Sequence, residues 1–160
     1  MPKISAGLLM YRDTDHGLEV LLVHPGGPFW QRKDNGAWTI PRGEVETGED
    51  YLAAAIREFS EETGWQPQGP YLPLGEVRPR SGKTVHAWAF RGSFDPMSLR
   101  SNLFEIEWPP KSGRLQRFPE IDRGGFFTIS EANKKMLVSE LPFLDRLASA
   151  ARKSPIADSQ

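Results

Sequence analysis

The chain of 160 residues contains no cysteine. Disulfide bonds, thiol nucleophiles and zinc sites with thiolate ligands are therefore all excluded. The chain also lacks any apolar run near the roughly 20 residues that a membrane-spanning helix needs. The missing apolar run leads us to expect no membrane partner. The absence of cysteine is compatible with a reducing compartment, so we expect a cytoplasmic protein.

The sequence also lacks an excess of charge of either sign. Its 20 basic and 21 acidic residues give a formal net charge of −1. A protein that binds a nucleic-acid polymer usually presents a basic face, so we expect no such polymer as partner. A small phosphorylated ligand needs only a local basic patch and stays compatible with this composition. Nothing in the composition distinguishes a monomer from a homodimer.

Short apolar runs predict strands on both sides of a central helix. Strand-like segments cover residues 4–11, 18–24, 38–41, 71–77, 84–94 and 126–129. The stretch 107–125 carries proline and glycine and predicts a long loop. Ser130 is expected to cap a short helix, and residues 140–153 predict a closing amphipathic helix. This order of elements indicates an α/β fold of the α+β type, with helices packed on a mixed sheet.

Residues 49–63 predict the central helix. Four residues at spacings of three and four form the expected buried stripe, namely Leu52, Ile56, Phe59 and Thr63. Gly64 stands where helices commonly end in a left-handed residue. Either Thr47 or Asp50 can cap the start of the helix.

The same helix carries three carboxylates, Glu58, Glu61 and Glu62, on a face away from that stripe. They fall within an arc of about 100°, as the helical turn of 3.6 residues dictates. Like charges at these spacings repel one another. One interpretation is a solvated face on which Arg57 pairs with Glu61. The other is a site for a hard divalent cation such as Mg²⁺ or Mn²⁺, which prefers oxygen ligands.

The surrounding sequence favours the second interpretation. From residue 43 the chain reads "GEVETGEDYLAAAIREFSEETGW", which resembles the Nudix box. All the fixed positions match, namely Gly43, Glu49, Arg57, Glu58, Glu61, Glu62 and Gly64. Phe59 and Trp65 occupy the bulky apolar positions, where aliphatic residues are more usual. A chance match of this kind is expected on the order of once per million sequences.

The resemblance implies the Nudix fold, an α/β/α sandwich with a mixed sheet, over residues 3–150. The segment 151–160 is then expected to be a flexible tail. The resemblance also implies hydrolysis of a phosphoanhydride in a nucleoside diphosphate linked to another moiety, with Mg²⁺ or Mn²⁺ as cofactor. The implied metal ligands are Glu58, Glu61, Glu62 and the backbone carbonyl of Arg42, with Gly43 letting the chain turn closely beneath the metal.

The general base has several candidates. In some family members a glutamate of the late loop takes this role, and Glu120 in "RFPEID" fits that position best, with Glu105, Glu107 and Asp122 as rivals. In other members a glutamate of the box is the base, which here means Glu61 or Glu62. Arg57 is expected to assist catalysis by orienting an acid.

The substrate is indicated by the residues that lead into the box. The segment "AWTIPRGEVETGED" resembles asymmetric dinucleoside polyphosphate hydrolases and a bacterial group predicted to be nucleoside triphosphate pyrophosphohydrolases. A small nucleotide of either kind is therefore the expected ligand. Trp30 is a candidate to stack a base, and Arg42, Lys33 and Lys83 are candidate phosphate contacts. The alternative is a non-catalytic Nudix-fold binding or scaffold module, which the complete set of box acids disfavours.

Overall fold

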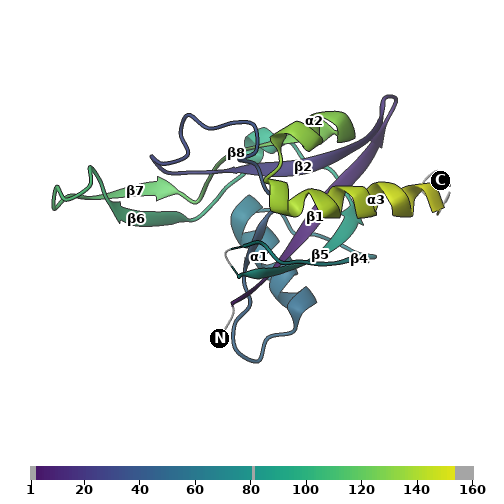
Figure 1. Ribbon diagram of the computed structural model, residues 1–160, viewed down its shortest axis with the longest axis horizontal. Coiled ribbons are helices and arrows are strands. Elements are labelled where there is room, and N and C mark those ends of the chain that lie inside the picture. Colours follow the sequence, from purple (N-terminus) through teal and green to yellow (C-terminus); the bar gives the residue numbers. More distant parts are fainter. Residues whose placement is uncertain (1–2, 81, 154–160) are drawn as a thin grey trace.

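The computed structural model describes residues 3–80 and 82–153 and shows a central sheet with helices on both faces (Figure 1). The sheet order is β4-β5-β1-β2-β8, and β3 also pairs with β1. The strands are β1 (Ile4–Thr14), β2 (Gly17–Pro25), β3 (Arg42–Glu44), β4 (Leu72–Val77), β5 (Thr84–Arg91) and β8 (Ile121–Thr128). Strands β1 and β5 run parallel while the other pairs are antiparallel, so the sheet is mixed as expected.

The alternation of side chains along β1 divides the core into two layers. Leu8 and Met10 point to the face covered by α1 (Tyr51–Thr63), where they pack with Phe59. Leu9 points to the opposite face and packs with Phe143. That second face is covered by α2 (Ile129–Lys135) and α3 (Leu141–Lys153). Successive strand residues face opposite sides of a sheet, and the resulting α/β/α sandwich confirms the expected fold class.

Helix α1 begins and ends at the residues that its sequence indicates. The Asp50 side chain accepts a hydrogen bond from Ala53 N at 3.1 Å, so Asp50 and not Thr47 is the cap. Gly64 closes the helix with a φ of 78°. Within the expected stripe Phe59 and Thr63 are buried, whereas Leu52 and Ile56 are only half-buried. Two small residues complete the buried face instead, namely Ala54 and Ala55.

The expected strand over residues 38–41 is reduced to two isolated bridges. Trp38 pairs with Met136 and Thr39 pairs with Val23. Pro41 has no N–H to continue a ladder, although its carbonyl accepts a hydrogen bond from Leu8 N at 3.2 Å. The continuous strand β3 therefore starts only at residue 42.

The expected loop over residues 107–125 is wrong for most of its length, because only residues 108–114 and 120 lie outside strands. Strands β6 (Leu103–Glu107) and β7 (Leu115–Pro119) form a hairpin that projects from the body of the molecule (Figure 1). Most of the remainder belongs to β8, in which Gly124 and Gly125 pair with β2. A Cβ on Gly124 would lie 2.8 Å from Leu99 Cδ1, so this glycine reflects close packing within a strand and not a turn.

The capping residue of α2 also differs from the expectation. Thr128, not Ser130, is the cap, and it forms a capping box in which its side chain accepts from Glu131 N while the Glu131 side chain accepts from Thr128 N. Helix α3 starts one residue later than expected, because residues 138–140 form a short 3₁₀ turn. Of the expected tail, residues 154–160 lie outside the described residues. No helix in the described part of the chain is long and apolar enough to cross a membrane.

Candidate functional site

Gly43 brings strand β3 directly against helix α1. A Cβ built on Gly43 would lie 2.0 Å from Cδ of Glu58, so the Glu58 carboxylate occupies the space that any other residue would fill. The neighbouring Arg42 N donates a hydrogen bond to Glu62 Oε1 at 3.3 Å. Pairing of β3 with β1 holds this backbone in place. The box glycine therefore sets the distance between the strand and the acidic face of the helix.

Arg57 lies at the centre of an acidic network. Its Nε and one terminal nitrogen donate to the two oxygens of Glu49 at 2.8 and 3.0 Å. The other terminal nitrogen donates to Glu58 at 2.9 Å and to Glu61 at 3.4 Å, so the expected pair with Glu61 is present. The hydrogen bonds from Arg57 lower the pKa of Glu49 to about 2. Arg57 thus acts on the orientation of the box carboxylates.

The three helical carboxylates differ in their exposure, which the interpretation as a solvated face does not predict. Glu61 is exposed and Glu58 is half-buried, but Glu62 is only 8% exposed. Burial raises the pKa of Glu62 well above its usual range, and the charge of Glu58 adds to this effect. Burial likewise raises the pKa of Glu58, against the opposing influence of Arg57. Ionisation of Glu62 inside the protein is therefore unfavourable unless a positive charge lies beside it.

Glu120 joins this acidic group from a distant part of the sequence. It lies between β7 and β8, with its N donating to the Asn102 carbonyl at 2.8 Å and its own carbonyl accepting from Gly26 N at 2.8 Å. Burial, followed by the charge of Glu61, raises the pKa of its carboxyl group. Glu120 in turn raises the pKa of both Glu58 and Glu62. The structure therefore brings Glu120 close to the box acids.

The three rivals of Glu120 have other partners. Glu105 pairs with Arg117 across the hairpin at 3.4 Å. The Glu107 carboxylate accepts a hydrogen bond from Gly113 N at 2.8 Å. Asp122 is hydrogen-bonded to His24 Nδ1 at 2.9 Å. None of the three lines the cavity to which Glu120 contributes.

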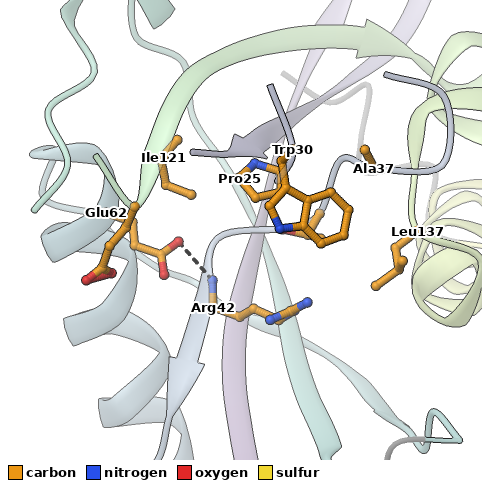
Figure 2. A pocket seen from close by; sticks show the side chains of 9 residues that line it. Pro25, Trp30, Ala37, Arg42, Glu62, Ile121 and Leu137 are labelled. Atoms are coloured by element: carbon orange, nitrogen blue, oxygen red, sulfur yellow. Dashed lines mark hydrogen bonds between the residues drawn. The ribbon is translucent and has the colours of Figure 1, made fainter. Parts of the chain in front are cut away.

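A cavity of about 260 Å³ extends from the acidic group to an apolar end (Figure 2). Glu62 and Glu120 line one end. The other walls come from Pro25, Trp30, Ala37, Thr39, Arg42, Ile121 and Leu137. Lys33 Nζ lies 5.0 Å from the centre of the Trp30 ring, so these two expected substrate contacts are neighbours. Lys83 does not line the cavity and lies 3.7 Å from the Glu44 carboxylate.

Two buried residues beside the cavity were missed by the sequence analysis. Glu140, 1% exposed, forms an ion pair with the Arg42 guanidinium and accepts from Ile40 N at 3.1 Å. His24 is fully buried, and its Nε2 donates to the Lys33 carbonyl at 2.6 Å. No sequence signal reveals either contact, because His24 lies in an apolar strand and Glu140 is remote from Arg42 in the chain.

The donor set suits a hard divalent cation. In residues 3–80 and 82–153, no group of three or more acidic or histidine side chains is arranged so that it could hold a metal ion without rearrangement. The chemistry nevertheless fits, because Glu58, Glu61, Glu62 and Glu120 supply oxygen ligands, and the pKa values of Glu58, Glu62 and Glu120 are each raised in part by the charge of another member of this group. The space left by Gly43 keeps the backbone close to them. A cation would relieve the repulsion within this group.

A family model of the NUDIX domain matches residues 1–147 of the chain. The chain belongs to the Nudix family. It is similar to an RNA pyrophosphohydrolase of Roseobacter denitrificans, at 58% identity over 53 residues, which are 31% of this chain and 33% of that protein. It is also similar to an 8-oxo-(d)GTP phosphatase of Mycolicibacterium smegmatis, at 27% identity over 125 residues, 71% of this chain and 36% of that protein. The matches thus span about a third of the length of each relative.

Solved structures share the Nudix fold with this chain. A binary complex of a C. elegans Ap4A hydrolase has a TM-score of 0.67 at 20% identity, covering 93% of this chain and 98% of that one. A mutT/nudix family protein from Listeria innocua has a TM-score of 0.65 at 18% identity, covering 98% of each chain. At these identities the likeness establishes the fold alone.

Proposed function

We propose that this Nudix protein hydrolyses a phosphoanhydride of a nucleoside triphosphate or dinucleoside polyphosphate and depends on Mg²⁺ or Mn²⁺. One observation carries the proposal: carboxylates from two separate elements meet in a cavity that is also lined by Trp30 and several apolar side chains. Such a concentration of charge suits a cation and the phosphates bound to it. The Trp30 indole in the same cavity offers a surface for a nucleobase.

Each member of the acidic group receives a role in this proposal. Glu58, Glu61, Glu62 and the carbonyl of Arg42 would hold the cation, and Gly43 gives their backbone and side chains room to approach. The bound cation would neutralise phosphate charge and lower the pKa of an attacking water. Arg57 is a positioning residue, since its hydrogen bonds fix Glu58 and Glu61.

Glu120 is the general base in this proposal. It lines the cavity, and its raised pKa favours acceptance of a proton from water. Both of its backbone groups are hydrogen-bonded, which holds the residue at the acidic end. Glu105, Glu107 and Asp122 are less suited, because their carboxylates are engaged elsewhere.

The choice of substrate class rests on the cavity and on similar proteins. The names of those proteins refer to RNA, 8-oxo-(d)GTP and Ap4A, each of which contains nucleotide units. A cavity of about 260 Å³ is near the lower end of the range for small-molecule sites, about 300 Å³. It therefore suits one nucleoside unit, with the remaining phosphates at the acidic end.

The test is hydrolysis of nucleoside triphosphates and diadenosine tetraphosphate with and without Mg²⁺, with identification of products. ATP plus AMP from diadenosine tetraphosphate would assign the dinucleoside reaction. A monophosphate plus pyrophosphate from a triphosphate would assign pyrophosphohydrolysis. If no nucleotide is hydrolysed in a metal-dependent way, the proposal fails and a non-catalytic binding module is favoured.

A further inference from the structure

Arg42 carries a side chain whose geometry differs from that of a phosphate contact. Its backbone lies beside Glu62, but Figure 2 shows the side chain running past Trp30 toward Leu137, away from the acidic end. Nε donates to Glu140, a residue that is 1% exposed and held by Ile40 N at 3.1 Å. The guanidinium is therefore anchored along one edge within the cavity.

The Arg42 guanidinium also carries two terminal nitrogens. The Arg42 side chain is 26% exposed and lines the cavity. Among the described residues no protein acceptor is found for its two terminal nitrogens, and no fully buried side-chain nitrogen there lacks a partner. These nitrogens can thus donate hydrogen bonds, in the plane of the guanidinium, to a ligand that lies beside Trp30.

An ion pair with Glu140 maintains this arrangement. The Arg42 guanidinium, which carries its charge at any ordinary pH, pairs with the carboxylate of Glu140, a residue that is 1% exposed. The guanidinium stays charged, and it cannot turn toward the phosphates without leaving the buried Glu140 carboxylate unpaired. Loss of a buried charged partner is strongly unfavourable.

We propose that Arg42 selects a 6-oxopurine base, guanine or hypoxanthine, by donating two hydrogen bonds to its O6 and N7 while Trp30 stacks on the ring. Guanine presents two adjacent acceptors on this edge, whereas adenine presents N7 beside a donor amino group. The two N–H donors of an arginine guanidinium match the two acceptors of guanine. With adenine, one of these donors would face the amino group, which is also a donor. This inference rests on the proposed function, and it adds the identity of the base.

The same geometry predicts a distinction between closely related guanine nucleotides. Hypoxanthine shares O6 and N7 with guanine and lacks only the 2-amino group, so inosine nucleotides should be used as well as guanosine nucleotides. The 8-oxo derivative of guanine carries a hydrogen on N7, which removes one of the two acceptors. A buried donor left without its acceptor disfavours the oxidised base.

The experiment compares kcat/KM for GTP, ITP, ATP and 8-oxo-GTP, and the affinity for GMP, IMP and AMP by titration calorimetry. We expect GTP and ITP to be equal and to exceed ATP and 8-oxo-GTP by about tenfold to a hundredfold, the discrimination of a bidentate arginine contact. The Arg42→Lys variant should lose most of this preference. Arg78→Lys is the control, because Arg78 pairs with Glu76 on the exposed surface and does not line the cavity.

The two proposals fail in different ways. The monophosphates contain no anhydride, so their binding reports on the base even if no nucleotide is hydrolysed. Equal affinity for GMP and AMP, or no binding of any monophosphate, would overturn the role of Arg42. Loss of kcat/KM in equal proportion for all four triphosphates in Arg42→Lys would also overturn it, because that result identifies a phosphate contact. The wild-type comparison decides the matter even if the variant does not fold.

Discussion

Glu62 combines burial with charge at a single residue. The residue is 8% exposed, and its carboxylate accepts a hydrogen bond from Arg42 N at 3.3 Å and lines the cavity. We expect Glu62→Gln, and likewise Glu61→Gln, to reduce turnover by about a hundredfold or more, the loss typical of a general base or metal ligand. Steady-state kinetics at saturating Mg²⁺ measures the effect, and circular dichroism checks the fold.

The control for these variants is Glu107→Gln, because Glu107 lies on the projecting hairpin and does not line the cavity. Its turnover should equal that of the wild type. Full activity in Glu61→Gln or Glu62→Gln would remove that residue from the mechanism.

The raised pKa of Glu62 also predicts the effect of pH on stability. Burial raises this pKa, so the folded state binds a proton more tightly than the unfolded state does. The free energy of unfolding must then fall as the pH rises from the unfolded pKa through the folded one. In chelator, wild type should lose stability over this interval, and Glu62→Gln should lose less. Urea titrations of both proteins from pH 5 to pH 8 test this, and parallel curves for the two would contradict it.

At the scale of elements, the start of α2 depends on Thr128. Its side chain accepts from Glu131 N at 3.1 Å, and the Glu131 carboxylate accepts from Thr128 N at 2.9 Å. Thr128→Ala should therefore lower the free energy of unfolding by about 1 kcal/mol, the usual value of such a cap. Ser130→Ala is the matched control and should change it by less than about 0.5 kcal/mol. An equal loss in the two variants, measured by urea unfolding, would restore Ser130 as the cap.

Elements with a local signal were predicted correctly, and those that depend on distant partners were not. Helix α1 could be predicted because its cap, its stripe and Gly64 lie within one segment. The β6–β7 hairpin was missed because the prolines and the glycine between its strands indicated a loop, whereas its pairing, such as Phe104 with Phe118, joins residues far apart in the sequence. The strand β8 was missed at Gly124, since glycine usually indicates a turn and here it allows contact with Leu99.

At the scale of the whole molecule, the candidate site also combines residues with a local sequence signal and residues that only the fold brings together. Spacing places the three acids of the box on one helix face, but only the resemblance assigns them to a metal site, and Glu120 too is indicated only by resemblance. The partners of Arg42 and Lys33, namely Glu140 and His24, carry no local signal because the fold alone brings them together. Burial of Glu62 could not be foreseen either, since it depends on β3, where Arg42 N donates to Glu62, lying against the helix.

The acidic group predicts a coupling between cation binding and the stability of the whole molecule. A cation that binds only the folded state stabilises it by about 2.7 kcal/mol when its concentration is a hundred times its dissociation constant. Mg²⁺ should therefore raise the thermal midpoint of the wild type, and more so above pH 7 than at pH 5, because the raised pKa values of Glu58 and Glu62 favour protonated ligands in acid. In Glu62→Gln the shift should be largely lost, whereas Glu107→Gln should retain it. Differential scanning calorimetry at matched ionic strength measures this, and a shift that persists in Glu62→Gln would place the cation elsewhere.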